Sequence, residues 1–315
     1  MLRHMSGRPQ KLMLLDTASL YFRAFFGVPD TVTAPDGTPV NAVRGLLDFI
    51  SRLVDEYEPT HLACCWDNDW RPKWRVDLLP TYKAHRVVVQ RPGGVPDVEE
   101  VPDPLEQQIP IIVATLQAFG ITIVGADHYE ADDVIGTLAT DAGMPVDIVT
   151  GDRDLFQLVE DDAEVRVLYT ARGVGKHERV DNAWVRERYG VDADQYAAFA
   201  TLRGDSSDGL PGVAGVGDKT AAVLLNRFGD LDAIIAAAQD PEGDMGPGPR
   251  GKIKAAVDYL EVAPTVVAVA RDIDLGSPDL TLPNSPADPE MLEAIAEQWG
   301  LKSPVSRLLE VLNKA

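Results

Sequence analysis

Short apolar runs alternate with amphipathic segments over the first two thirds of the chain, and this alternation limits the possible folds more than any other feature. A short apolar run bounded by polar residues or glycine is typical of a buried strand, whereas apolar residues spaced three and four apart indicate a helix. Alternating strands and helices imply right-handed crossovers and a mostly parallel sheet covered by helices, which is an α/β fold. The expected strands are Lys11–Leu15, His61–Trp66, Ile121–Val124 and Val146–Thr150, and the expected helices are Ala42–Tyr57, Leu105–Phe119 and Glu130–Ala142.

The pattern becomes helical from about Asp192 onward. A Gly-rich turn, Gly209–Gly217, separates two helical stretches, and a loop rich in Pro and Gly follows at Gln239–Gly251. We therefore expect two parts, an α/β core over residues 11–190 and a helical region over residues 191–315.

Carboxylates stand where the expected strands end. Because the carboxyl ends of parallel strands meet at one edge of a sheet, acids at these positions should gather there. The start of the helix after Ile121–Val124 adds further acids, and two more stand beyond the expected helix Tyr196–Leu202. The set comprises Asp16, Asp67, Glu130, Asp132, Asp133, Asp152, Asp154, Asp205 and Asp208.

One aspartate at such a position is most simply explained as a helix cap. The whole set needs another explanation, because like charges raise each other's pKa or push a site apart. No comparable set of Lys or Arg is interleaved with these acids. All-oxygen ligation suits Mg²⁺ or Mn²⁺, and the lack of nearby His or Cys argues against Zn²⁺. We expect two or more divalent ions, which activate water for attack at phosphorus.

The formal net charge of −21 taken alone argues against a nucleic-acid partner. Between Arg71 and Arg91, however, six cations face one acid, and aromatic residues are interleaved with them. Cations above a carboxylate cluster can hold a substrate phosphate, and aromatic rings can stack on bases. The alternative is a solvated basic helix with its aromatic residues in the core. The DNA contacts expected in this segment are Arg71, Arg75 and Tyr82.

A second expected DNA contact is the Gly-rich hairpin at residues 212–217. Glycines at a helix N-terminus leave free N–H groups that bind an anion. The spacing is not that of a Walker P-loop, because Gly217 is followed by Asp218. It fits the hairpin of a helix–hairpin–helix, which holds backbone phosphates. The expected contacts are Gly215, Gly217, Lys219 and Thr220.

Two further features bear on location. Cys64 and Cys65 are adjacent, which disfavours a disulfide between them and predicts buried thiols in a reducing cytoplasm. No run approaches the roughly 18–20 apolar residues of a membrane span. We expect a cytoplasmic protein without a membrane partner.

Several motifs occur together in one order: LLDTASLYFRAFFG at 14–27, TYKAHR at 81–86, YEADDVIGTLA at 129–139, VTGDRDLFQLV at 149–159 and LRGDSSDGLPGVAGVGDKTAAVLL at 202–225. With them the chain resembles the bacterial 5′ nucleases of the flap-endonuclease superfamily, which include the 5′–3′ exonuclease domain of DNA polymerase I. The resemblance weakens after Gly229, and no polymerase-like sequence follows, so the expected form is the stand-alone nuclease.

The resemblance implies a PIN-like core with a helical arch at about residues 70–104. It also implies a helix–three-turn–helix, a form of helix–hairpin–helix, at about residues 196–229. The implied activity is Mg²⁺-dependent hydrolysis of DNA phosphodiesters at 5′ flaps and ends, with Mn²⁺ as a substitute, in primer removal and DNA repair. The expected form is a monomer that works beside a DNA polymerase supplied by another chain.

The resemblance also assigns roles. It places Asp16, Asp67, Glu130, Asp132 and Asp133 in one group of metal ligands and Asp152, Asp154, Asp205 and Asp208 in another. It implies that Lys83 and Arg86 contact the scissile phosphate. It implies K⁺ bound by backbone carbonyls of Gly212, Val213 and Val216. Two departures from the family pattern are Gly209 after Asp208, and His85 within the YKAHR motif.

Two other functions remain open at this point. One is a protein that binds flaps without cutting them, which the complete set of acids disfavours. The other is a PIN-type ribonuclease, which the helix–hairpin–helix disfavours because A-form RNA presents different grooves from duplex DNA.

Overall fold

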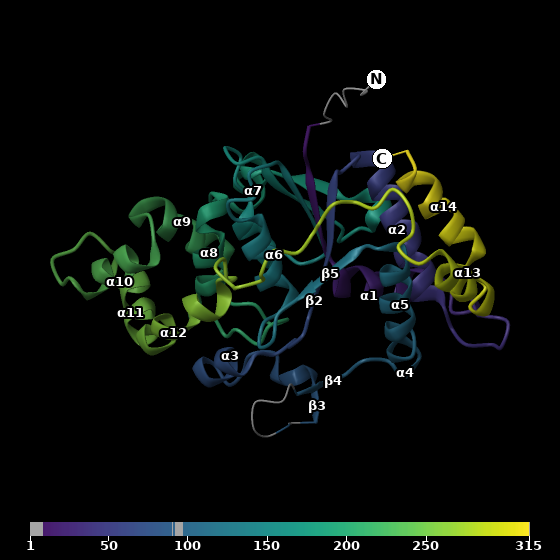
Figure 1. The fold of residues 1–315 in the computed structure, drawn as a ribbon. Coiled ribbons are helices and arrows are strands. Elements are labelled where there is room, and N and C mark those ends of the chain that lie inside the picture. The colour runs from purple at the N-terminus through teal and green to yellow at the C-terminus, as the bar shows by residue number, and fades with distance from the viewer. Residues whose placement is uncertain (1–8, 90, 92–96, 315) are drawn as a thin grey trace.

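The structure is a computed structural model that describes residues 9–89, 91 and 97–314. Its centre is a six-stranded sheet with the strand order β5-β2-β1-β6-β7-β8. All neighbouring strands in it are parallel except β7 and β8, which pair antiparallel (Figure 1). The strands are β1 Leu12–Asp16, β2 His61–Trp66, β5 Thr122–Gly125, β6 Val146–Thr150, β7 Val165–Tyr169 and β8 Glu178–Val180.

The four strands expected from apolar runs are confirmed. Three of them, β1, β2 and β6, are buried on both faces and therefore largely apolar, whereas β5 is an edge strand that is only partly buried. The side chains of β1 alternate between two hydrophobic clusters. Leu12 and Leu14 belong to one cluster, whereas Met13 and Leu15 belong to the other. The sheet thus has a core on each face.

Helices cover both faces. The cluster with Met13 is closed by α1, α2 and α5, and the cluster with Leu14 is closed by α6, α7 and α8. Their bounds are α1 Thr17–Gly27, α2 Asn41–Tyr57, α5 Ile109–Phe119, α6 Ala131–Ala139, α7 Asn182–Tyr189 and α8 Tyr196–Arg203. Short 3-10 turns lie at Asp154–Leu158, Val174–Lys176 and Ala193–Gln195.

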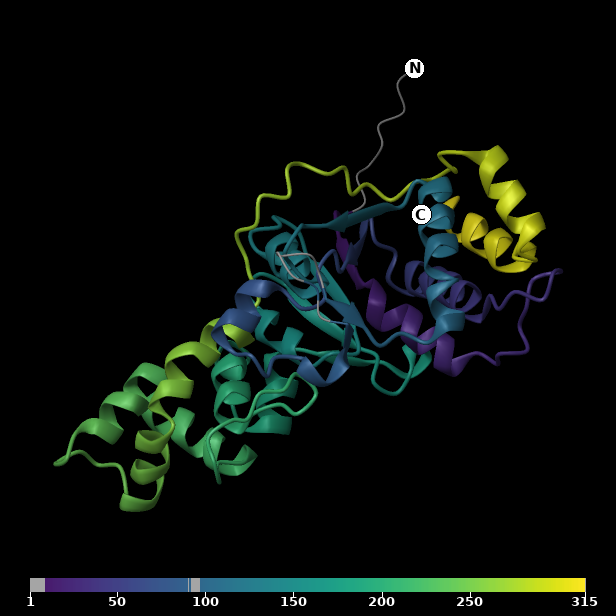
Figure 2. The same ribbon diagram turned by 90° about the horizontal axis from the view of Figure 1, so that it is seen from below.

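The helical region continues through α9, α10, α11 and α12, which extend away from the sheet (Figure 2). These helices are α9 Asp218–Phe228, α10 Leu231–Gln239, α11 Pro247–Ala255 and α12 Val257–Val267. No helix among the described residues is both long enough and apolar enough to span a membrane.

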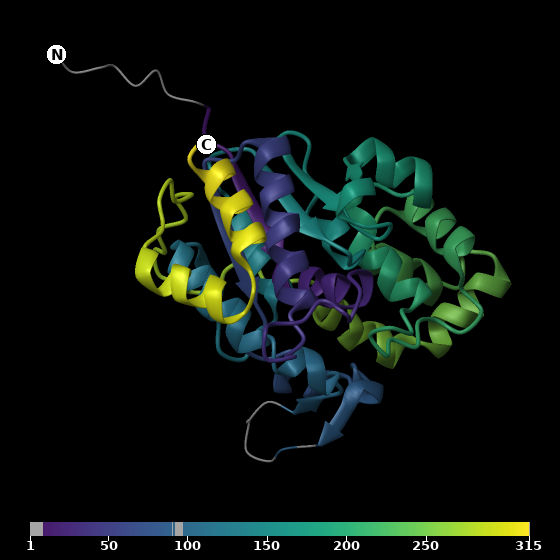
Figure 3. The same ribbon diagram turned by 90° about the vertical axis from the view of Figure 1, so that its right-hand side faces the viewer.

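The last two helices were expected in the helical region, residues 191–315, but they pack against the α/β core. After α12 the chain runs back across the molecule, and α13 Pro289–Gln298 and α14 Lys302–Leu312 pack beside α5 and α2 (Figure 3). The physical reason is apolar burial, since Leu292, Val305 and Leu308 complete the cluster over that face of the sheet.

The arch segment, residues 70–104, also differs from the expected helical arch. It holds one short helix, a 3-10 turn, a two-stranded antiparallel hairpin and a second short helix. Residues 90 and 92–96 of the expected arch lie outside the described residues. The elements are α3 Lys73–Leu78, the 3-10 turn Ala84–Arg86, β3 Val87–Val89, β4 Val98–Glu99 and α4 Asp103–Glu106.

Candidate active site

Three strand ends bring carboxylates to the same edge of the sheet, as the alternation predicts. Asp16 is the last residue of β1, Asp67 follows β2, and Asp152 stands two residues beyond β6. Asp16 also caps α1, since its Oδ1 accepts a hydrogen bond of 3.1 Å from the amide of Ser19. Asp16 is therefore both the N-cap of a helix and a candidate residue of the site.

A cavity of about 230 Å³ opens at this edge. Five of the nine predicted acids line it, and two predicted cations, Lys83 and Arg86, face it from the arch segment. The lining acids are Asp16, Asp67, Glu130, Asp132 and Asp152, and we call this space the acid cavity.

Electrostatics in the acid cavity disfavour the ionised carboxylates. Burial raises the pKa of Asp16 to about 7, and the charges of Asp67 and Asp152 act in the same direction. Burial and then the charges of Asp16 and Asp152 raise the pKa of Asp132 well above its usual value. The pKa of Asp67 is likewise raised, first by burial. A divalent cation would relieve this repulsion, because it favours the charged form of every acid around it.

The second group of predicted ligands lies beside the first. Asp154 is buried, and its Oδ1 has no hydrogen-bond partner. Burial raises its pKa well above the usual value, and the charges of Asp152, Asp208 and Asp205 add to that shift. Burial also raises the pKa of Asp208. These carboxylates repel one another across a short space, as those of the acid cavity do.

Asp205 differs from its neighbours because it has its own counter-charges. Burial opposes ionisation, but hydrogen bonds from Ser207 and the charges of Arg153 and Arg203 lower its pKa below the usual value. Both arginines contact its Oδ2 at 3.1 Å. Its carboxylate is therefore ionised without a metal.

The donor set fits hard divalent cations. An orphaned buried oxygen on Asp154 and mutually repelling carboxylates are what such ions would satisfy. Among the residues that the structure describes, no three His, Cys, Asp or Glu side chains converge closely enough to make a ready-formed metal cage. The ions themselves would have to draw the carboxylates together.

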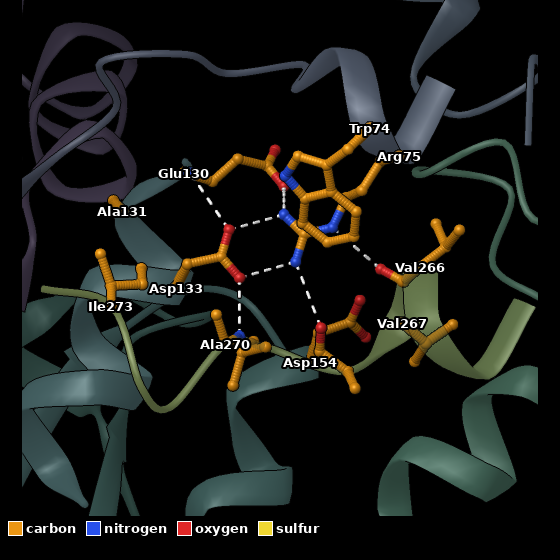
Figure 4. A network of polar contacts seen from close by, with 12 residues as sticks. Trp74, Arg75, Glu130, Ala131, Asp133, Asp154, Val266, Val267, Ala270 and Ile273 are labelled. Carbon is orange, nitrogen blue, oxygen red and sulfur yellow. Dashed lines mark hydrogen bonds and ion pairs between the residues drawn. The ribbon is translucent and has the colours of Figure 1, made fainter. Parts of the chain in front are cut away.

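Two predicted ligands, Glu130 and Asp133, are held by cations and hydrogen-bond donors of the protein (Figure 4). Arg75 bonds to both, and Lys83 bonds to Glu130. Glu130 borders the acid cavity, whereas Asp133 is completely buried and does not line it. Of Glu130, Asp132 and Asp133, only Asp133 does not line the acid cavity.

The three DNA contacts predicted in the arch segment are buried rather than exposed. Arg71, Arg75 and Tyr82 are 4%, 2% and 3% exposed. Arg71 donates to the carbonyls of Tyr82 (2.6 Å) and Pro80 (3.1 Å), and the Tyr82 hydroxyl donates to Glu130 (2.7 Å). Internal acceptors therefore use the groups that we expected to bind phosphate or bases.

Lys83 and Arg86 do reach the acids. Burial alone would lower the pKa of Lys83, but the charge of Glu130 beside it raises that pKa well above the usual value. Arg86 is about one third exposed and lies 3.3 Å from Oδ1 of Asp208. Both cations line the acid cavity together with its carboxylates.

Gly209 explains how the arch segment comes so close to the second acid group. Its φ is +72°, and a Cβ there would lie 2.0 Å from the carbonyl oxygen of Thr81. The amide of Lys83 donates to the carbonyl of Asp208 at 2.9 Å. The departure from the family pattern at Gly209 thus permits a close backbone contact between two parts of the site.

The Gly-rich hairpin joins α8 to α9, and Gly217 is the N-cap residue of α9. Gly215, Gly217 and Lys219 are exposed, and Thr220 is half-buried, so this end of α9 is open to a ligand. The Lys252 ammonium of α11 donates to the carbonyl of Gly215 at 2.6 Å. The side chains of Val213 and Val216 are buried beneath the hairpin.

Sequence reasoning missed several residues of the acid cavity, among them Ser19, Phe22 and Glu99. Ser19 and Phe22 follow Asp16 at intervals of three, which places them on one face of α1, so a spacing rule could have found them. Ser19 also accepts a hydrogen bond of 2.9 Å from the amide of Gly151. Glu99 comes from the β3–β4 hairpin, and no local pattern marks it.

A larger cavity of about 550 Å³ lies elsewhere, lined by Lys11, Tyr57, Asp147 and Arg166 among others. Lys11 and Arg166 contact Asp147 at 2.8 Å and 2.6 Å. Because the buried acid there is already neutralised, the acid cavity is the stronger candidate for chemistry despite its smaller volume.

Comparison with known proteins identifies the family of the chain. Residues 11–190 match the family model described as 5′-3′ exonuclease, N-terminal resolvase-like domain. Residues 191–290 match the family model described as 5′-3′ exonuclease, C-terminal SAM fold. The chain belongs to the 5′-3′ exonuclease family. The resemblance read from the motifs is thus confirmed.

Relatives within this family cover almost the whole chain. A 5′-3′ exonuclease of Streptomyces coelicolor is 60% identical over 95% of this chain and 99% of its own length. One of Mycobacterium tuberculosis is 52% identical over 96% of this chain and 98% of its own length. DNA polymerase I of Mycobacterium bovis is 37% identical over 96% of this chain, which spans 32% of that protein's length.

Solved structures show the same fold at low sequence identity. The bacteriophage T5 D15 flap endonuclease in complex with DNA and metal ions has a TM-score of 0.63 and 19% identity, covering 96% of this chain and 100% of that one. Human GEN1 in complex with Holliday junction DNA has a TM-score of 0.63 and 16% identity, covering 96% and 72%.

Proposed function

We propose that this 5′-3′ exonuclease family member is a structure-selective nuclease that hydrolyses DNA phosphodiesters at 5′ flaps and 5′ ends with Mg²⁺. The observation that carries the proposal is the acid cavity, where Asp16, Asp67, Asp132 and Asp152 meet beneath Lys83 and Arg86. The T5 and GEN1 structures, which contain DNA, support the substrate class.

Asp16, Asp67, Asp132 and Asp152, with Asp154, Asp205 and Asp208 beside them, would hold two or more Mg²⁺ ions. When bound, such ions supply an activated water and a Lewis acid for the attacking and leaving oxygens. Lys83 and Arg86 would bind the phosphate and stabilise the charge that develops on it. The products would carry a 5′-phosphate and a 3′-hydroxyl.

The Gly-rich hairpin would hold the duplex through backbone amides together with Lys219 and Thr220. Amides at the N-terminus of α9 suit phosphate regardless of base sequence. A K⁺ ion on the carbonyls of Gly212, Val213 and Val216 remains part of the proposal. We further propose a monomer, acting in the cytoplasm in primer removal and repair, with polymerisation supplied by another chain.

Gel-resolved cleavage of a labelled 5′-flap duplex, with Mg²⁺ and with excess chelator, tests this function. We expect cleavage near the junction only with Mg²⁺, and none from Asp132→Ala although that variant still binds the flap. Asp162→Asn is the matched control, because Asp162 is exposed and does not line the acid cavity. Binding without cleavage in both Mg²⁺ and Mn²⁺ would instead indicate a flap-binding protein. Cleavage of single-stranded RNA alone would indicate a ribonuclease.

A further inference from the structure

Arg75 is the centre of a buried network that joins three distant parts of the chain (Figure 4). It projects from α3 at the base of the arch segment, and its side chain is 2% exposed. Its partners are Glu130 and Asp133 at the start of α6 and the carbonyls of Val266 and Ala268 at the end of α12. The Trp74 ring lies against the guanidinium, with the ring centroid 4.4 Å from Cζ of Arg75.

The guanidinium has no N–H group to spare. Arginine offers five donors: one on Nε and two on each terminal nitrogen. Nε donates to Val266 (3.0 Å). One terminal nitrogen donates to Glu130 and to Asp133 (2.7 Å), and the other to Asp133 (2.7 Å) and Ala268 (3.2 Å). Because every donor has an internal acceptor, none is left for a DNA phosphate.

The carboxylate of Asp133 likewise has its acceptor positions occupied by donors of the protein. Its Oδ1 accepts from Arg75 (2.7 Å) and from the amide of Ala270 (2.8 Å). Its Oδ2 accepts from Arg75 (2.7 Å) and from the amide of Glu130 (3.2 Å). An ionised carboxylate has about four acceptor sites, so the protein itself occupies the positions that a metal would need.

The network leads from Arg75 to the acid cavity through Glu130. Oε2 of Glu130 accepts from Arg75 and from the Tyr82 hydroxyl, and its Oε1 accepts from Lys83. The amide of Ala131, the next residue, donates to Oδ1 of Asp67 at 2.8 Å. The turn that Arg75 fixes therefore also sets the places of Lys83 and Asp67.

We propose that Arg75 and Asp133 are a pair of positioning residues that contact neither DNA nor metal. The pair clamps the first turn of α6 between α3 and the end of α12, and Glu130 transmits that clamp to Lys83. This inference rests on the proposed function for what the acid cavity does. It removes Asp133 from the metal ligands and Arg75 from the DNA contacts that the sequence predicted.

Counting bound Mn²⁺ by electron paramagnetic resonance tests the role of Asp133. Asp133→Asn should bind as many ions as the unsubstituted chain, whereas Asp132→Asn, the neighbouring carboxylate on the same helix, should bind fewer. Loss of an ion from Asp133→Asn, with the fold intact by circular dichroism, would overturn the proposal. An unfolded Asp133→Asn beside a folded Asp132→Asn would support it, because a ligand can be lost without loss of the fold.

The salt dependence of flap-duplex binding tests the role of Arg75. Removing one cation that pairs with a DNA phosphate lowers the slope of log affinity against log salt by about 0.9. Arg75→Met, which removes the charge, should keep the slope as long as circular dichroism shows the fold intact, whereas Lys219→Met, on the exposed end of α9, should lower it by about that amount. A lowered slope for a folded Arg75→Met would make Arg75 a phosphate-binding residue and overturn the proposal.

Steady-state cleavage tests whether Arg75 positions the reacting groups. Arg75→Lys keeps the charge but loses the planar fork, so kcat should fall on the order of 100-fold while KM stays within about twofold, as expected for a misplaced reacting group. A rise in KM with unchanged kcat would contradict positioning. The Mn²⁺ counts need no cleavage, so this inference can fail or stand apart from the proposed function.

Discussion

The hydroxyl of Thr150 donates a hydrogen bond of 2.6 Å to Oδ2 of Asp16, which joins the ends of β6 and β1 beside the acid cavity. This bond lowers the pKa of Asp16 against the stronger effect of burial. It therefore favours the ionised form, which is the form that binds a cation.

Thr150→Val should move the acidic limb of the pH profile of kcat/KM toward higher pH. A hydrogen bond donated to a carboxylate stabilises its charged form, so losing the bond raises the pKa of Asp16 above about 7. Thr150→Ser, which keeps the hydroxyl, is the control. An acidic limb that does not move would show that Asp16 ionisation does not limit metal-dependent cleavage.

Metal-free protein should lose stability as pH rises from about 4 toward 7. The pKa of Asp16 is about 7 in the folded chain against an ordinary value of 3.8, so between these values the folded chain holds a proton that the unfolded chain releases. The free energy of unfolding should fall by up to about 1.4 kcal/mol per pH unit from this group. Urea denaturation with chelator present measures the fall, and added Mg²⁺ should reverse it near neutral pH. A free energy that rises over this window would contradict the raised pKa.

Lys83→Ala should slow the chemical step far more than it weakens DNA affinity. The ammonium stands over the acid cavity, where it would stabilise charge that develops on the phosphate only during the reaction. Single-turnover rates and equilibrium binding, measured on one flap duplex, give the two quantities. Equal losses in both would make Lys83 an anchor for ground-state DNA.

Gly209→Ala should destabilise the fold by about 1–3 kcal/mol, because a positive φ is strained for alanine and the added Cβ meets the Thr81 carbonyl at 2.0 Å. Gly27→Ala is the control, because a Cβ there meets no atom within 4 Å. Thermal unfolding of both variants measures the difference. Similar melting temperatures would mean that the arch segment shifts aside at little cost.

DNA binding should weaken as salt rises, despite the net charge of −21. The surfaces proposed to meet phosphate, at Arg86 and at the exposed end of α9, are basic or rich in free amides, so the local field decides the salt dependence. Fluorescence anisotropy on a flap duplex from low to moderate salt gives the slope. If the affinity for DNA did not depend on salt concentration, these surfaces would not form part of the DNA interface.

Local sequence predicts those residues of the site that stand at the ends of strands. Asp16, Asp67 and Asp152 follow short apolar runs, and parallel strands must bring such positions to one edge. The strands β7 and β8 escaped prediction because a charged residue interrupts each short run, Arg166 in β7 and Arg179 in β8.

Charge pattern could not distinguish Lys83, which lines the acid cavity, from Arg75, which is buried among internal partners. Both are cations in one short basic stretch, and nothing local distinguishes an exposed cation from a paired one. Arg75 finds Glu130 at a separation of 55 residues and Val266 at 191. Only the tertiary fold specifies partners so far apart, and burial without them would be prohibitive for a guanidinium.

The clamp around Arg75 has a consequence for how the enzyme is made. Its acceptors at Val266 and Ala268 are translated long after Asp16, Asp67 and Asp132, the acids of the cavity. A nascent chain that has left the ribosome only as far as α9 carries the acids but not the residues that close the network. The clamp can therefore close only after the chain as far as Ala268 has left the ribosome.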